Sequence, residues 1–168
     1  LGMRPCFGRG DRDYSQIEDY VLSKLKKLSN HKELVRLQGS ASLALEIMAS
    51  NFLYGNVLII STGFYSDRLI QLSKNAKLIT NNIKKITVVD FNDLDSVTGQ
   101  FDWIFSCYTE TSRGYKISIK KLKNKAEKLK SRIMLDATAS IGLEVKHDFA
   151  DVIGYSSCKG LFGLTGAA

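Results

Sequence analysis

The chain has 168 residues, of which 44% are hydrophobic and 24% are charged, and these proportions predict one globular domain with its own core. They exclude a disordered or fibrous chain. The net charge of +7 comes mainly from lysines on two segments that we expect to be helical, so we interpret it as a solvated helix surface. Aromatic residues do not alternate with these lysines, as single-strand binding would require, and we expect no nucleic-acid partner.

The three cysteines, Cys6, Cys107 and Cys158, are odd in number and widely spaced. Their spacing predicts neither a disulfide framework nor a metal site built from paired cysteines. The first residues form no hydrophobic signal core, and no apolar run has the length of a membrane span. We therefore expect a reduced, soluble, cytoplasmic protein that has no membrane partner.

Helical and strand patterns alternate along the chain. In chain order they predict a helix over 13–29, a short extended run over 35–37, a buried helix over 42–53, a strand over 56–61, a helix over 65–75, strands over 86–89 and 103–107, a helix with a lysine-covered face over 119–129, and strands over 132–135 and 152–155. This order predicts an α/β fold with a predominantly parallel sheet flanked by helices.

Polar and glycine-bearing segments lie where these strands end or where the neighbouring helices begin. In parallel α/β sheets, ligands bind beyond the carboxyl ends of the strands, so these segments are the candidate site. They are residues 39–42, 62–65, 108–114, 136–140 and 156–160.

Three of these segments carry a recognisable chemistry. Residues 39–42 (GSAS) start a buried helix, where free backbone N–H groups and hydroxyls suit a phosphate, although an ordinary serine cap is the commoner explanation of this segment taken alone. Asp136 ends a buried strand, where a carboxylate needs a cationic or hydrogen-bonding partner, or serves as a cap. Lys159 lies in an apolar, glycine-bearing stretch; partial desolvation would lower its pKa, as an imine-forming lysine requires, but a surface loop is the alternative.

Taken together and in order, five segments resemble the motif series of class V, fold-type I pyridoxal-phosphate aminotransferases. They are LQGSASLALE, STGFYSDR, YTETSRG, LDATASIG and SSCKGLFGLTG. Within that class they look most like 2-aminoethylphosphonate–pyruvate aminotransferases, and next most like alanine–glyoxylate and serine–pyruvate aminotransferases. The resemblance covers the chain from about Arg12 to its last residue.

The resemblance implies that Ser40, Ala41 and Ser42 bind the phosphate of pyridoxal 5'-phosphate. Cys158 stands where the family commonly has an Asn or Gln that contacts this phosphate. Ala41 replaces the usual glycine, and its N–H remains available.

The resemblance also implies roles around the cofactor ring. Tyr65 would stack on the pyridine ring, Thr138 would pack against the opposite face, and the hydroxyl of Thr111 would reach the phenolic oxygen. Asp136 would pair with the pyridine nitrogen and keep the ring an electron sink. Lys159 would hold the cofactor as a Schiff base and move a proton between the substrate α-carbon and the cofactor C4′. An aromatic residue at position 65 also differs from the histidine of cysteine desulfurases.

Two departures from the family pattern bear on activity. Arg113 places a bulky cation in the usual small-residue run after Glu110. Family members continue into a further domain after the lysine, so we expect residues 1–168 to be an apparently truncated large domain without the C-terminal small domain. The full-length protein is expected to be a homodimer that acts on a small amine and a 2-oxo acid.

Three functional hypotheses remain open from the sequence. The first is an aminotransferase, or part of one, that moves an amino group from a donor such as 2-aminoethylphosphonate to an acceptor such as pyruvate. The second is a non-catalytic relative that acts as a binding module, which Ala41, Cys158 and the chain length favour. The third is a Rossmann-like nucleotide-binding domain, because NVLIISTGF resembles a strand that leads into a glycine turn; the absence of G-x-G-x-x-G counts against it.

Overall fold

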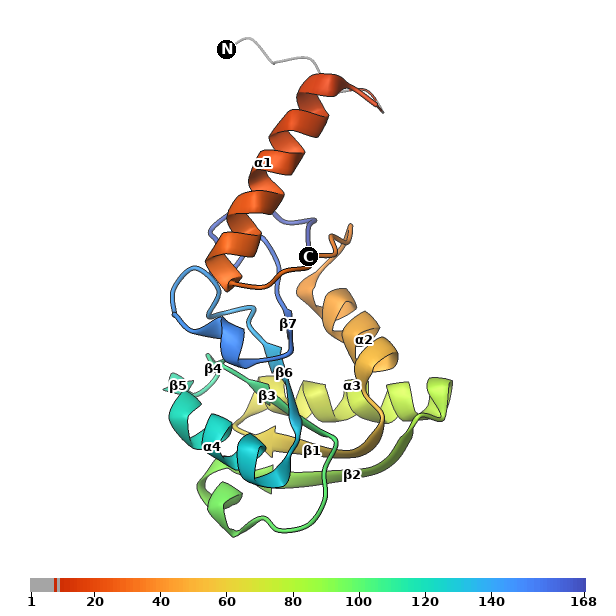
Figure 1. Ribbon diagram of the computed structural model, residues 1–168, viewed down its shortest axis with the longest axis vertical. Coiled ribbons are helices and arrows are strands. Elements are labelled where there is room, and N and C mark those ends of the chain that lie inside the picture. The colour runs from red at the N-terminus through yellow and green to blue at the C-terminus, as the bar shows by residue number, and fades with distance from the viewer. Residues whose placement is uncertain (1–7, 9) are drawn as a thin grey trace.

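The computed structural model describes residue 8 and residues 10–168, and it is an α/β structure with a five-stranded sheet (Figure 1). The strand order is β2-β1-β3-β6-β7, and every pairing in this sheet is parallel. The predicted fold class is therefore confirmed. Cys6 lies outside the described residues. The five strands are β1 (Gly55–Ser61), β2 (Ile83–Asp90), β3 (Trp103–Cys107), β6 (Arg132–Asp136) and β7 (Val152–Gly154).

Helices cover both faces of the sheet. Helix α2 (Ala41–Phe52) and helix α3 (Phe64–Thr80) pack together on one face, and helix α4 (Ile119–Leu129) packs on the other. The described residues also form two 3-10 helices, η1 (Phe91–Ser96) and η2 (His147–Phe149), and a small antiparallel hairpin of β4 (Thr109–Glu110) and β5 (Tyr115–Lys116).

The sequence of strand β1 is continuously apolar because both of its faces are buried. Val57 and Ile59 belong to the core on the α2–α3 face, whereas Leu58 and Ile60 belong to the core on the α4 face. Successive side chains of a strand point to opposite faces, so a strand covered on both sides needs an apolar residue at every position. All four side chains are fully buried.

Helix α1 (Arg12–Ser29) projects away from the rest of the molecule (Figure 1). It begins where the side chain of Asp11 accepts hydrogen bonds from the Asp13 and Tyr14 amides, and it ends at Asn30 in the left-handed conformation. Ser29 is its one buried residue, and its apolar side chains are largely exposed. Helix α1 therefore has little core of its own within the described residues.

The structure differs from the predicted elements in places where tertiary pairing decides the outcome. Strand β2 starts at Ile83, three residues before the predicted run, because it pairs along the whole of β1. The extended run over 35–37 is not a strand of the sheet; the adjacent Gln38 forms an isolated antiparallel bridge to Ala167. Helix α3 continues to Thr80, beyond the predicted end at position 75. The η1 turn and the β4–β5 hairpin were not predicted.

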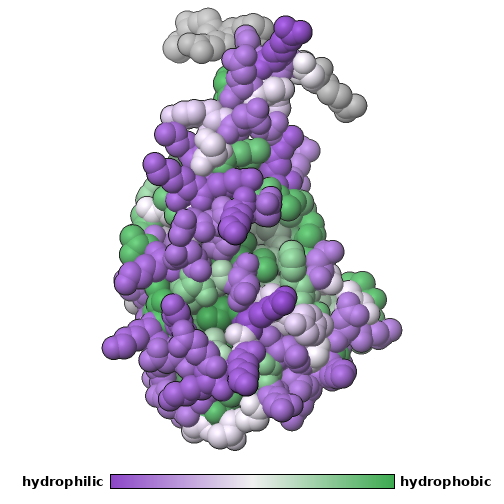
Figure 2. Space-filling model, viewed as in Figure 1, coloured by the Kyte–Doolittle hydropathy of each residue, from purple (hydrophilic) through white to green (hydrophobic). Residues whose placement is uncertain are grey.

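Hydrophilic residues cover most of the visible face of the molecule, with hydrophobic areas between them (Figure 2). None of the described helices is both long enough and apolar enough to cross a lipid bilayer.

Candidate functional site

Asp136 lies at the carboxyl end of β6, between β3 and β7, on the side of the sheet where ligands of parallel α/β proteins bind. Its Oδ1 accepts a hydrogen bond from the Thr138 amide at 2.9 Å, and its Oδ2 lies 3.9 Å from the Cys107 thiol. Burial raises the pKa of Asp136, because a desolvated carboxylate is disfavoured, although the nearby Thr138 hydroxyl and the Thr138 amide oppose this effect. Among the described ion pairs, none involves Asp136. A cation brought to this carboxyl group would favour its charged form.

Thr138 connects Asp136 to the segment that carries Lys159. The Gly160 amide donates to the Thr138 carbonyl at 3.2 Å. A side chain at Gly160 would place its Cβ 2.2 Å from the Ile141 carbonyl oxygen, so this close approach requires glycine. The Thr138 hydroxyl oxygen is buried near the Asp136 carboxylate, but it has no partner of good hydrogen-bond geometry. It lies close enough to Asp136 to oppose the rise in the pKa of this carboxyl group.

The Lys159 side chain is exposed, and no ion pair or hydrogen bond of its ammonium is present among the described contacts. Its backbone carbonyl accepts a hydrogen bond from the Phe162 amide, so residues 159–162 form a turn. Phe162 has a φ of +54°, which is uncommon for a residue with a side chain. Residues 8 and 10–168 do not bury the Lys159 side chain. The predicted partial desolvation of its amine is therefore wrong for this structure.

The start of α2 lies next to the segment that follows Lys159. The Gly39 amide donates to the Gly166 carbonyl, and the Ser157 amide donates to the Ala167 carbonyl, both at 2.9 Å. Ser40 is the N-cap of α2, and its hydroxyl accepts a hydrogen bond from the Leu43 amide. Ser40 therefore forms an ordinary serine cap at the start of α2.

This cap leaves donors unused at the start of α2. The amides of Ala41 and Ser42 are the first two of the helix, and no acceptor is present for them among the described residues. The exposed end of α2 thus retains the donors and the positive dipole end that an anion needs.

Tyr65 lies in the first turn of α3 and is 40% exposed, and its ring meets the Phe64 ring edge to face. Its backbone amide donates to the carboxylate of Glu110, which is fully buried. The same carboxylate accepts hydrogen bonds from the Ser66 amide and from the Thr62 and Ser112 hydroxyls. No local sequence pattern indicates this role of Glu110, because only the fold shows that a carboxylate in this turn is buried.

The remaining predicted site residues make few contacts with other side chains. Thr111 is exposed in the turn between β4 and β5, and its carbonyl accepts a hydrogen bond from the Gly114 amide. Cys158 is a half-buried free thiol that lies 3.6 Å from the Ser156 hydroxyl. Arg113 is exposed and lines a hollow of about 270 Å³ beside the carboxyl ends of β1 and β2.

A buried Ser140–His147 pair was also missed. The Ser140 hydroxyl and His147 Nε2 lie 2.9 Å apart, and both side chains are almost completely buried. Burial lowers the pKa of His147, since the charged imidazolium is disfavoured there. The hydrogen bond of this pair connects η2 to the segment that follows Asp136, and so helps to hold that segment in place.

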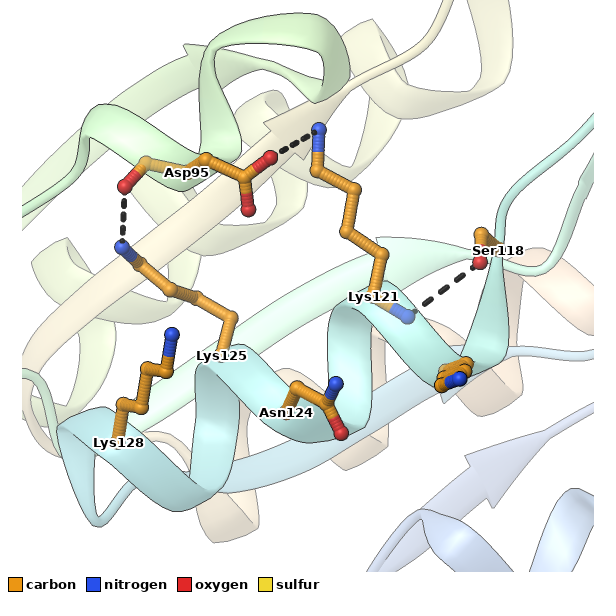
Figure 3. Close-up of a pocket in the computed structure, with 7 residues that line it drawn as sticks. Asp95, Ser118, Lys121, Asn124, Lys125 and Lys128 are labelled. Atoms are coloured by element: carbon orange, nitrogen blue, oxygen red, sulfur yellow. Dashed lines mark hydrogen bonds and ion pairs between the residues drawn. The ribbon is translucent and has the colours of Figure 1, made fainter.

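A second hollow lies away from Asp136, between η1 and α4 (Figure 3). It measures about 390 Å³, and lysines of α4 line it. Lys125 is buried and donates to the backbone carbonyls of Asp95 and Val97, and Lys121 forms an ion pair of 3.2 Å with Asp95. Lys125 thus satisfies carbonyls at the end of η1, and Lys121 joins α4 to η1, which gives both lysines a structural role.

Comparison with models of protein families finds no match, and comparison with curated proteins finds no similar sequence. Solved structures with the same fold do exist. They include an aspartate aminotransferase of subgroup IV from Thermus thermophilus (TM-score 0.84, 18% identity), an alanine–glyoxylate aminotransferase from Nostoc sp. (0.79, 16%) and a cysteine desulfurase from Thermococcus onnurineus (0.71, 19%).

Each of these comparisons covers 98% of this chain, but between 45% and 49% of the other chain. The chain therefore spans about half the length of the proteins it matches. The fold that the resemblance implied is confirmed. Because the identities are low and a desulfurase has the same fold, the choice among activities depends on the site residues. Among the described residues, no cluster of His, Cys, Asp and Glu side chains is arranged for a metal ion.

Proposed function

We propose that this chain is the large, cofactor-binding domain of a pyridoxal-phosphate-dependent aminotransferase, and that Lys159 is the residue to which the cofactor attaches. The observation that carries the proposal is Asp136, a buried carboxylate at the edge of the sheet that has no cationic partner among the described residues. A protonated pyridine nitrogen is the partner that would offset its desolvation.

The surrounding groups suit the rest of the cofactor. The unused amides of Ala41 and Ser42, with the nearby hydroxyls, would hold a phosphate at the start of α2. The buried hydroxyl of Thr138 and the half-exposed ring of Tyr65 would contact the ring system. When bound, the cofactor supplies an electron sink next to the substrate α-carbon.

Lys159 would act as the acid–base group of the site. Its amine would accept the proton from the substrate α-carbon and return it at the neighbouring carbon of the cofactor. The Lys159 side chain is exposed, so this role requires that the bound cofactor, the rest of the protein or a second subunit cover it. We propose that the complete protein provides this cover as a homodimer. Exposed apolar side chains on α1 and α2, such as Ile17 and Ile47, support such an interface.

For the substrates, we propose an amine donor of the 2-aminoethylphosphonate kind and a 2-oxo acid acceptor such as pyruvate. Arg113, which lines the hollow near β1 and β2, supports a donor that carries an anionic group at this end of the sheet. Alanine or serine as donor, with glyoxylate or pyruvate as acceptor, is the alternative that half-reactions with each amine would distinguish.

The nucleotide-binding hypothesis has a specific observation against it. In a Rossmann-like site, the pyrophosphate would bind at the start of α3, directly after the glycine turn of β1. The Glu110 carboxylate already occupies this position and accepts the Tyr65 and Ser66 amides. A second anion there would meet a fixed negative charge.

The test is the absorbance of the protein titrated with pyridoxal phosphate, before and after reduction with borohydride. We expect a visible band that reduction removes, with the cofactor mass found on the peptide that contains Lys159. The band should be absent in Lys159→Ala and retained in Lys123→Ala, which changes an exposed lysine of α4. A label spread over surface lysines, or a band that persists in Lys159→Ala, would overturn the proposal.

A further inference from the structure

Glu110 combines complete burial with a negative charge that no cation offsets. Its pKa is lowered: burial alone would raise it, but the hydrogen bonds from Ser112, Ser66 and Tyr65 outweigh burial. The carboxylate is therefore ionised near neutral pH. Its partners are the amides at the start of α3, where the positive end of the helix dipole favours an anion.

These hydrogen bonds join two segments that are far apart in the sequence. Glu110 Oε2 accepts the Tyr65 amide at 3.1 Å and the Ser66 amide at 3.2 Å, while Oε1 accepts the Ser112 hydroxyl. The Ser112 hydroxyl in turn accepts the Phe64 amide at 3.2 Å. The start of α3 and the turn after Glu110 thus share one set of bonds.

The backbone conformation at Gly63 and the absence of a side chain there leave space for the Glu110 side chain. Gly63 has φ +154° and ψ −154°, a conformation that residues with side chains avoid. A Cβ at this position would lie 2.9 Å from both Cγ and Cδ of Glu110. The glycine is therefore required both by its conformation and by the space that the carboxylate occupies.

We propose that Glu110 is a positioning residue of the candidate site, which holds the ring of Tyr65 and the turn that carries Thr111 in one fixed arrangement. Glu110 does not touch the ligand itself. It acts through the backbone of Tyr65 and through Ser112. The part of the proposal that concerns cofactor affinity rests on the proposed function, whereas the part that concerns the arrangement of the two segments does not.

The first experiment needs no cofactor. Amide hydrogen exchange of Tyr65 and Ser66 is measured by NMR in the wild type, in Glu110→Gln and in Asp67→Asn. Gln has nearly the same shape but carries no charge, and only one of its two terminal atoms can accept, so the Tyr65 and Ser66 amides lose their charged acceptor. We expect exchange of these two amides to accelerate about 10-fold in Glu110→Gln, since an amide that is held less strongly opens more readily.

Asp67→Asn is the matched control, because Asp67 is also acidic and lies in the first turn of α3, but it is exposed and accepts none of the described hydrogen bonds. It should leave the exchange of both amides unchanged. Equal exchange in Glu110→Gln and the wild type would overturn the proposal. If Glu110→Gln does not fold, Ser112→Ala, which removes one donor to Oε1, provides the same measurement with a milder change.

The second experiment measures pyridoxal-phosphate affinity in a double-mutant cycle of Glu110→Gln and Tyr65→Ala. We expect Glu110→Gln to weaken binding about 10-fold in the wild type and less than about 2-fold when Tyr65 is already absent, because coupled residues are not additive. Equal effects in both backgrounds would mean that Glu110 does not act through Tyr65. Absence of binding in the wild type would refute the proposed function, while the exchange experiment still decides the role of Glu110.

Discussion

Replacing Gly63 by alanine tests whether the bend between β1 and α3 depends on its glycine. The φ and ψ of this residue lie in a region that is nearly restricted to glycine, which costs an alanine roughly 1–3 kcal/mol. The added Cβ would also stand 2.9 Å from the side chain of Glu110, and such overpacking costs roughly 1–3 kcal/mol. We therefore expect Gly63→Ala to lower the free energy of unfolding by about 3 kcal/mol.

Thermal and urea denaturation, followed by circular dichroism, would measure this loss. In a domain of this size, a change of about 3 kcal/mol corresponds to a melting temperature lower by roughly 6–12 °C. Gly99→Ala is the control, because Gly99 also has a positive φ, +112°, but a Cβ there meets only ordinary contacts. It should cost about 1 kcal/mol through backbone strain alone.

The reasoning fails if Gly63→Ala is no more destabilising than Gly99→Ala. A second check separates strain from steric conflict. In a Glu110→Ala background, where the facing side chain is gone, Gly63→Ala should cost measurably less than in the wild type, and an unchanged cost would show that Glu110 is not the obstacle.

Two further predictions concern buried charges. Lys125→Met should lower the free energy of unfolding by about 1–3 kcal/mol, because the Asp95 and Val97 carbonyls lose their donor. Lys128→Met, a change in the same hollow, should leave the free energy of unfolding within about 0.5 kcal/mol of the wild type. Equal urea midpoints for the two variants would contradict this prediction. Asp136→Asn should raise the urea midpoint of the cofactor-free protein at pH 7 while it weakens pyridoxal-phosphate binding. Burial raises the pKa of Asp136 above its usual 3.8, so the folded state keeps this proton to higher pH than the unfolded state, and the stability of the wild type falls as the pH rises through that interval. The advantage of Asn should therefore shrink toward pH 3, and an unchanged or lower midpoint at pH 7 would refute it.

Local sequence patterns predicted the elements whose burial is strictly periodic. Strand β3 and helix α4 have the predicted bounds, because an unbroken apolar run and an apolar stripe at helical spacing each fit a single structure. The start of β2 was less predictable, since Lys84 and Lys85 hide a strand that exists because it pairs with β1. The β4–β5 hairpin, with two residues in each strand, is too short for any periodicity to indicate it.

The candidate site shows the same division. Asp136 and the 39–42 turn could be singled out from the sequence, because a carboxylate that ends an apolar strand and a small-residue turn before an apolar helix are local patterns. That Lys159 is exposed, and that the segment following it pairs with residues 37–39, depends on contacts between distant parts of the chain.

The sequence by itself thus determined the order of strands and helices and the parallel sheet, because apolar periodicity is local and alternation leaves few topologies. The tertiary structure decided which polar groups are buried together. Glu110 accepts amides that lie 44 and 45 positions earlier in the chain, and no local pattern encodes a hydrogen bond across that separation. Burial and charge compensation arise when segments meet, so the residue that fixes Tyr65 in place became visible only in the folded chain.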